Sequence, residues 1–266
     1  MRAQSQKAQG RIPKFYLYKM TVDDGGAPCV QDGMLTLAIC KPTIRRVAPV
    51  GSVVLAFAGE CMKRDGYLDN CIVYAAVVSR RVPNREYYSK RQHAHRRDCI
   101  YKRSGNGFAR KAKAKFHHGP GDLEHDLGAA PDYPNAVLLS NGAKNFRYFG
   151  TKCPVEYKKK FPRLRRLIER LTEGHRVNHD PVLYRELLGL KRELWKVRSA
   201  ITRLSVIAEP GSRCGCDDVA VECALWPFPT CPPDNLGRSG QFASFRRHPT
   251  NSGRRDRITC HVQGIH

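Results

Sequence analysis

Three uninterrupted apolar runs constrain the fold more than any other feature of this sequence. They span residues 34–40, 52–58 and 71–78, which read MLTLAIC, SVVLAFA and CIVYAAVV. Apolar runs of this length, bounded by turn signals, are typical of buried β-strands. Three further segments have shorter strand patterns, at residues 14–20, 136–140 and 146–149. The sequence therefore predicts a buried sheet that is built mainly from the first half of the chain.

Two helices are expected after these strands. The first spans about residues 158–173, with apolar side chains on one face and Gly174 at the stop. The second can be N-capped by Asp180, and Pro181 suits its first turn. A heptad seam then follows, formed by Leu183, Leu187, Leu190, Leu194, Val197, Ile201 and Leu204. This 183–204 seam can pack within the chain or form an oligomer with a second copy.

The composition divides the chain into three segments. Residues 1–13 are basic and free of acids, which predicts a disordered arm, and residues 14–205 carry the α+β pattern. Residues 206–266 are rich in Gly, Pro, Ser, Arg and Cys without periodicity, which favours disorder. Four cysteines of this tail form either a zinc site or a chance cluster, because their spacing matches no usual zinc pattern. They are Cys214, Cys216, Cys223 and Cys231.

The cysteines and the absence of export signals indicate a reducing compartment. The chain has 11 cysteines, an odd number, and no secretory signal precedes them. No apolar run reaches the length of a membrane-spanning helix. We therefore expect free thiols, a cytoplasmic location and no membrane partner.

The charge balance indicates a polyanionic partner. Lys and Arg total 47 against 24 acids, which gives a net charge of +23. Such an excess attracts nucleic acid, and we expect DNA in preference to RNA, or a nucleotide. The stretch 80–115 is the most basic, and its cations alternate with aromatic residues. It is expected to be a flexible loop that either binds single strands or is simply mobile and solvated.

No recognised catalytic signature is present in the sequence. Phosphate-binding loops, nucleophile elbows and zinc protease or deaminase patterns are all absent. The pair His117-His118 can bind metal or transfer protons, or it is an exposed pair in a loop. We therefore expect no cofactor and no metal.

Three cations lie between two of the buried runs without a nearby acid. They are Lys41, Arg45 and Arg46, and the glycine at the entry to the next strand, Gly51, is of a kind that recurs in small β-barrels. The expected fold is therefore an α+β domain with a strongly curved mixed sheet or a small barrel, and two C-terminal helices packed beside it.

The order of motifs resembles the nucleotide modification associated domain, second type, over about residues 14–205. The matching stretches are LTLA at residues 35–38, CKP at 40–42, IRR at 44–46, the Asp98-x-Ile100-Tyr101 motif and the Gly174-His175-Arg176 motif. Ser52 and Cys99 depart from the family pattern, which usually has an aspartate and an asparagine there.

The resemblance implies a nucleotide or flipped-base pocket, in a fold like the PUA and EVE base-reading barrels. Its expected residues are Lys41, Arg45, Arg46, Asp98, Tyr101, Arg147, Tyr148, His175 and Arg176. The alternative for the cations is a structural ion pair of Asp98 with Arg45 or Arg46.

Two functions remain open at this point. One is recognition of modified DNA or modified nucleotides within a nucleotide-modification or defence system. The other is a nucleotide- or base-modifying enzyme that uses Asp98 or His175 as acid or base.

Overall fold

The structure is a computed structural model that describes residues 12–152, 156–172 and 174–197. The expected disordered tail, its cysteine cluster and the last seam residues Ile201 and Leu204 lie outside the described residues. Across the described ranges, no helix combines the length and the apolar character needed to cross a membrane. The α+β class is confirmed by the arrangement of strands and helices described below.

A five-stranded mixed sheet forms the centre of the domain, in the order β10-β5-β4-β1-β11. Its strands are β1 (Phe15–Met20), β4 (Val53–Ala58), β5 (Ile72–Val77), β10 (Phe146–Tyr148) and β11 (His175–Arg176). Strands β1 and β4 run parallel, and the other neighbours are antiparallel. The two central strands are almost completely buried, which explains their continuous apolar character.

A second sheet of four antiparallel strands has the order β2-β3-β9-β6. Its strands are β2 (Cys29–Gln31), β3 (Met34–Leu37), β6 (Arg80–Val82) and β9 (Val137–Asn141). A separate hairpin pairs β7 (Tyr101–Ser104) with β8 (Gly107–Arg110). The basic stretch that was expected to be a flexible loop is thus partly an ordered hairpin, and Phe108 anchors it against Tyr88 and Tyr133.

The helices are short except for the last one. They are α1 (Pro42–Val47), α2 (Asn84–Tyr87), α3 (Asp122–Leu127), α4 (Tyr157–Lys160), α5 (Pro162–Arg170) and α6 (Pro181–Lys196), with 3₁₀ turns at Glu60–Asp65 and Arg91–His93. The helix expected over 158–173 is therefore two helices, because Pro162 begins a new one. Asp180 caps α6 as expected, since its side chain accepts bonds from two backbone amides of the first turn.

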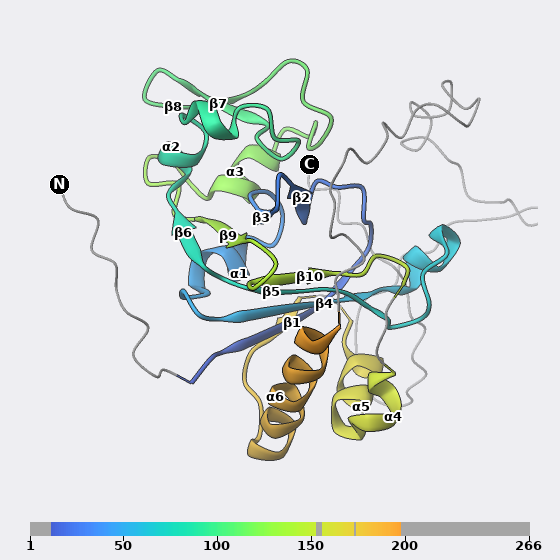
Figure 1. The fold of residues 1–266 in the computed structure, drawn as a ribbon. Helices are drawn as coiled ribbons and strands as arrows, with labels where there is room; N and C mark the ends of the chain where they lie inside the picture. Colours follow the sequence, from blue (N-terminus) through green and yellow to red (C-terminus); the bar gives the residue numbers. More distant parts are fainter. Residues whose placement is uncertain (1–11, 153–155, 173, 198–266) are drawn as a thin grey trace, which may run out of the picture. The chain divides into compact units, whose positions relative to one another are not determined.

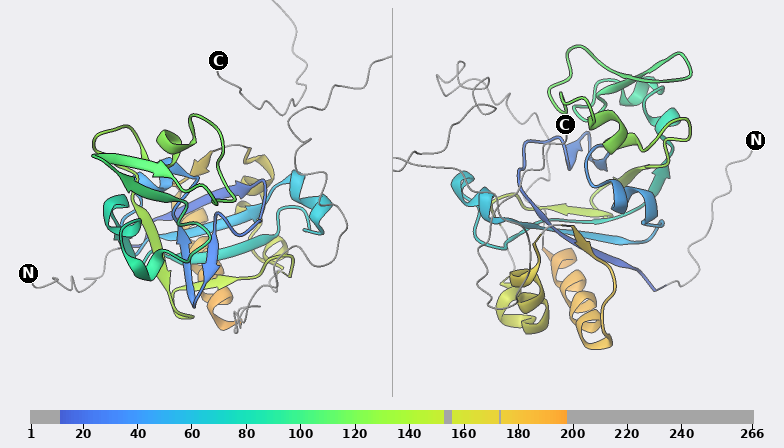
Figure 2. Two further views of the ribbon diagram at one scale, coloured as in Figure 1. Left: turned by 90° about the horizontal axis from the view of Figure 1, so that it is seen from above. Right: turned by 180° about the vertical axis from the view of Figure 1, so that it is seen from behind.

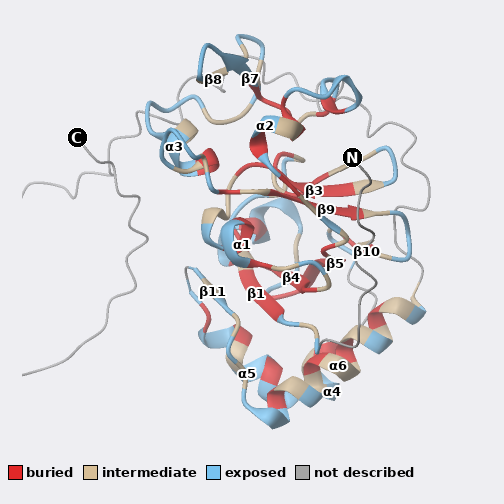
Figure 3. Cartoon of the chain, turned by 90° about the vertical axis from the view of Figure 1, so that its left-hand side faces the viewer, coloured by how far each residue is buried: buried red, intermediate tan, exposed pale blue. Residues whose placement is uncertain are grey.

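The central sheet lies between two layers (Figure 1, Figure 2). Phe15 and Leu17 of β1 point to the side covered by α4, α5 and α6. Tyr16, Tyr18 and Met20 alternate with them and point to the side of the second sheet and α1. Figure 3 shows β1, β4 and β5 of the central sheet mostly buried and the outer faces of the helices exposed. The sheets remain separate and open within the described residues, so of the two expected forms, a curved mixed sheet or a small barrel, the barrel is not found.

The seam of α6 packs within the chain. Leu183, Leu187, Leu190 and Leu194 are buried in the same core cluster as the strands they face. This burial stabilises the helix through tertiary contacts, as is usual for an amphipathic helix of this length. An oligomer through this seam stays a prediction, and it would have to use residues beyond these four leucines.

Candidate thiol active site

Cys40 lies at the tip of a sharp turn between β3 and α1. Its φ is 54°, and that of Lys41 is 46°. Non-glycine residues rarely adopt such left-handed conformations, which cost about 1–3 kcal/mol and cluster at functional sites. His117 has a φ of 55° as well. Three strained residues thus lie at one place in the fold.

These residues belong to a hydrogen-bonded chain of three side chains. The Sγ atom of Cys40 lies 3.2 Å from Nε2 of His117. The other ring nitrogen of His117, Nδ1, lies 2.5 Å from Oδ2 of Asp126. A thiol, an imidazole and a carboxylate in this order form the arrangement in which a base activates a nucleophile and an acid orients the base.

Asp126 is held rigidly by groups from three parts of the chain. Its carboxylate is fully buried and accepts bonds from the backbone amide of Cys40 at 2.7 Å and the hydroxyl of Tyr101 at 2.7 Å. Nη1 of Arg45 lies 3.9 Å from Oδ1 of Asp126. The carboxylate therefore fixes both the nucleophile's backbone and the imidazole.

Arg45 contacts both Cys40 and Asp126. The side chain is fully buried and donates to the carbonyls of Ala136 at 3.0 Å and Cys40 at 3.2 Å. Burial lowers the pKa of this guanidinium, and the charge of Asp126 acts in the opposite direction. The ion pair expected between Asp98 and Arg45 or Arg46 is therefore not formed: Arg45 faces Asp126, and Asp98 pairs with Arg96 at 3.5 Å.

The electrostatic environment favours a protonated His117. Burial lowers the pKa of the imidazole, but the bonds to Asp126 and Cys40 together outweigh it and raise the pKa to about 10. The thiolate is the nucleophilic form of cysteine, and His117 is placed to exchange a proton with Cys40. Cys40 is partly exposed, so a substrate can reach it.

Lys41 adds a second cation beside Cys40. Its ammonium lies 4.6 Å from the centre of the Tyr18 ring, which is a cation–π contact. Burial lowers the pKa of Lys41, and the charge of Cys40 partly reverses this shift. Lys41 follows Cys40 directly and is half-buried, while Arg46 is exposed and not part of the hydrogen-bonded chain.

The stability of the folded protein should depend on pH through His117. Its pKa in the folded state, about 10, exceeds the ordinary value of 6.5. The stabilisation is therefore complete below about pH 6.5 and is lost as the pH rises through about 10. We expect the free energy of unfolding to decline over this range, and to decline less in His117→Gln. Chemical denaturation at a series of pH values measures this, and an equal decline in both proteins would contradict the ion pair.

Asp98 lies in a different buried network. Its carboxylate accepts a bond from Tyr87 at 2.8 Å and a short bond from Thr36, and it faces Arg96. The side chain is fully buried. The arrangement stabilises the second sheet, so Asp98 is not brought together with Arg45 and Arg46 as an ion pair.

The remaining expected site residues are spread over the domain. Arg147 donates to the carbonyls of Trp195 and Val197 at the end of α6, and Tyr148 donates to Asp23 at 2.5 Å. His175 lies 5.9 Å from the ring of Tyr16. Arg176 lines a pocket beside α5.

Sequence reasoning missed the three central residues of the site. The sequence places Cys40 at the end of an apolar run without indicating a reactive thiol, it allows His117 either a functional or an exposed role, and it gives no signal for Asp126. Cys40 and His117 are 77 positions apart, and no spacing rule links them. The available signal was a cysteine at the end of an apolar run, directly before Lys41-Pro42. The sequence could not identify its histidine partner, because a catalytic Cys and its His can be far apart in the chain and meet only in the fold.

No group of three or more metal-ligating side chains is arranged to hold a metal ion in the part of the chain that the structure describes. The fold and the site together define an α+β domain with a candidate cysteine nucleophile. The family model of nucleotide modification associated domain 2 matches residues 12–178, so the chain belongs to this family. This associates the chain with nucleotide-modification systems. No curated protein and no solved structure matches the chain.

Proposed function

We propose that the chain is a thiol-dependent enzyme of a nucleotide-modification system that transfers or hydrolyses an acyl group. Cys40 is the nucleophile, His117 moves the proton and Asp126 orients His117. The observation that carries the proposal is the 3.2 Å contact between Cys40 Sγ and His117 Nε2, with Asp126 behind the ring. The family supplies the association with nucleotides.

The proposed reaction has two steps. The thiolate of Cys40 attacks a carbonyl carbon of an amide or ester group, and His117 protonates the departing amine or alcohol, which leaves a thioester on Cys40. Water or an amine then attacks the thioester, and His117 accepts its proton as the thiolate departs. Lys41 stabilises the negative charge that develops beside Cys40.

A second candidate is recognition of modified DNA or modified nucleotides without chemistry. The net charge of +23 favours it, because such a surface binds polyanions regardless of any reaction. The enzyme expected from the sequence, with Asp98 or His175 as acid or base, has weaker support. Both carboxylate oxygens of Asp98 already accept bonds, and its side chain is fully buried.

Mass spectrometry of products distinguishes the two candidates. The protein is incubated with modified and unmodified DNA and nucleotides, including bases that carry amide or ester groups. We expect conversion of one class and an acyl adduct on Cys40. Cys40→Ser should lower turnover by about 10³-fold or more, because it removes the nucleophile.

The matched control is Cys61→Ser, which removes an exposed free thiol elsewhere in the chain. It should retain the conversion and the adduct. Unchanged conversion in Cys40→Ser would contradict the proposed nucleophile. Tight binding of a modified ligand without conversion in any variant would favour recognition instead.

A further inference from the structure

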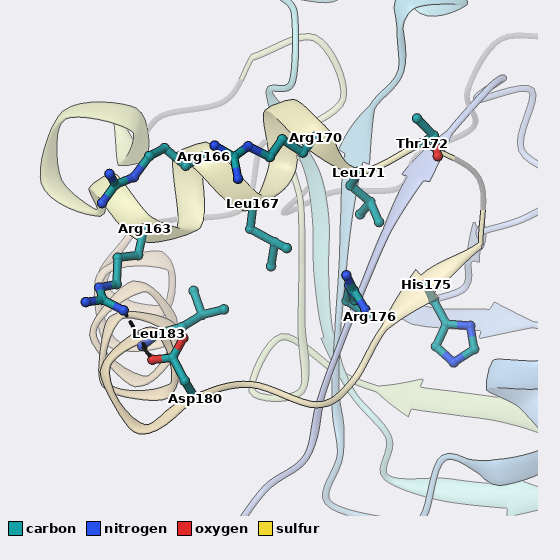
Figure 4. A pocket seen from close by; sticks show the side chains of 10 residues that line it. All are labelled: Arg163, Arg166, Leu167, Arg170, Leu171, Thr172, His175, Arg176, Asp180 and Leu183. Carbon is teal, nitrogen blue, oxygen red and sulfur yellow. Dashed lines mark hydrogen bonds and ion pairs between the residues drawn. The ribbon is translucent and has the colours of Figure 1, made fainter. Parts of the chain in front are cut away.

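We propose that an arginine-lined pocket between α5 and β11 binds the phosphate backbone of a nucleic-acid strand. The pocket has a volume of about 580 Å³, within the range of ligand sites. Figure 4 shows its lining: Arg163, Arg166, Leu167, Arg170, Leu171, Thr172, His175, Arg176, Asp180 and Leu183. This proposal goes beyond the proposed function and does not require Cys40 to be a nucleophile.

Four guanidinium groups gather at this pocket. Arg163, Arg166 and Arg170 are three and four positions apart on α5, so they lie on one face of the helix. Arg176 comes from β11, on the sheet edge beside them (Figure 4). Like charges placed together in this way are destabilising unless a partner neutralises them.

The one acid among the described lining residues, Asp180, is already engaged. Asp180 caps α6 by accepting bonds from the amides of Val182 and Leu183, at 2.9 and 3.0 Å. It also lies 3.6 Å from Nη1 of Arg163. Arg166 and Arg170 therefore have no ion-pair partner within the described residues.

Arg176 is likewise exposed and without an ion pair to any residue that the structure describes. It pairs with Leu17 in the sheet register, and Leu17 points to the helix-covered side. Tyr18, the register partner of His175, points to the other side, where Lys41 and the thiol site lie. Arg176 and the arginines of α5 are therefore on the opposite face of the central sheet from Cys40, while His175 lies on the edge strand between the two faces.

The chemistry of the lining selects phosphate over bases. Arginine holds phosphate bidentately, with a planar fork of donors. Among the described residues of the lining, Tyr, Trp and Phe are absent and His175 is the single ring that could stack on an unpaired base. A lining dominated by guanidinium groups binds the backbone and positions it.

The spacing favours a strand over a single phosphate. Arg163 and Arg170 are seven residues apart, which is about 10 Å along a helix. A row of this length is longer than a single phosphate group, so it can contact successive phosphates of one strand. The net charge of +23 would draw such a strand to the domain.

The test compares two variants with equal changes in charge. The pocket variant carries Arg166→Gln, Arg170→Gln and Arg176→Gln. The control carries Arg64→Gln, Arg165→Gln and Arg192→Gln, at exposed positions outside the pocket lining. Affinity for a fluorescent single-stranded oligonucleotide is measured by anisotropy between about 50 and 200 mM salt.

We expect the slope of log affinity against log salt to become less steep by about 2 in the pocket variant, because three phosphate contacts are lost. Affinity at the lowest salt should fall on the order of 100-fold. The control should remain close to wild type. An equal loss of affinity in both variants would overturn the proposal and would indicate a general attraction by the net positive charge. No loss in either variant would overturn it as well.

Two further measurements complete the test. Inorganic phosphate and a nucleoside triphosphate are added as competitors. If the triphosphate binds as tightly as the oligonucleotide, the pocket binds a free nucleotide and the proposal of a nucleic-acid strand is overturned. Thermal melting verifies that the variants fold. If the triple variant does not fold, the single change Arg170→Gln should still reduce the slope by about 0.7, and an unchanged slope would overturn the proposal.

Discussion

Replacing His117 by Gln should lower turnover by about 10²–10⁴-fold, the usual contribution of a positioned acid–base group. Its Nε2 lies 3.2 Å from the Cys40 thiol, and no other imidazole contacts that thiol in the part of the chain that the structure describes. Glutamine keeps polar atoms near this position but cannot carry the positive charge. Both the activation of the thiol and the protonation of the leaving group would be lost.

Thiol alkylation measures the same effect without a known substrate. Iodoacetamide reacts with the thiolate form of cysteine. His117, whose Nε2 lies 3.2 Å from Sγ of Cys40, is the group placed to take up the thiol proton and to stabilise the resulting negative charge. We therefore expect alkylation of Cys40 near pH 6 to be about tenfold slower in His117→Gln. Peptide mass spectrometry after iodoacetamide treatment locates and times the reaction.

His118→Gln is the matched control, since it makes the same chemical change one position further along. His118 is exposed and contacts Arg110 and the carbonyl of Lys115. Its replacement should leave alkylation of Cys40 at the wild-type rate. Equal rates in wild type and His117→Gln would contradict the pairing of Cys40 with His117.

The sequence predicted those parts of the fold that depend on local pattern. The continuous apolar runs at 52–58 and 71–78 became β4 and β5, and the Asp180-Pro181 signal marked the start of α6 correctly. The strand predicted over residues 34–40 was wrong at its C-terminal end, because β3 stops at Leu37 and Cys40 lies in a left-handed turn. Apolarity cannot distinguish a strand residue from a buried turn residue, so pattern alone could not place that boundary.

The candidate site was less predictable because its contacts are long-range. The sequence identified Lys41 and Arg45 as cations without a nearby acid, and the structure shows that Arg45 does pair with an acid that is distant in the sequence. The partner, Asp126, is a single acid in a short helix, and nothing in its local pattern separates it from Asp122 or Glu124. Only the fold brings α3 against the turn at Cys40, at a separation of 86 positions.

Replacing Asp126 by Ala should destabilise the protein by about 3–5 kcal/mol, the cost of removing one partner of a buried ion pair. Arg45 would keep its charge in a fully buried position, at a distance where Asp126 is its one ion-pair partner among the described residues. The amide of Cys40 and the hydroxyl of Tyr101 would also lose their acceptor. Chemical denaturation near neutral pH measures the loss.

Asp126→Asn separates catalysis from stability, because it keeps the shape and the acceptor oxygen for Cys40. The amide group would face Nδ1 of His117 with a donor in place of an acceptor, which favours the wrong tautomer of the ring. Turnover should then fall by up to about 10⁴-fold, with a smaller loss of stability than in Asp126→Ala. The pH-dependent decline in stability should also weaken, because the carboxylate is one of the two groups that raise the pKa of His117.

Glu124→Gln provides the control, since Glu124 is an exposed acid on the same helix. It removes the same charge and should leave stability, alkylation of Cys40 and turnover close to wild type. If Asp126→Asn alkylates and turns over like Glu124→Gln, Asp126 does not orient His117. The network of Asp126, Arg45 and Tyr101 would then serve only to hold the turn at Cys40 in its left-handed conformation.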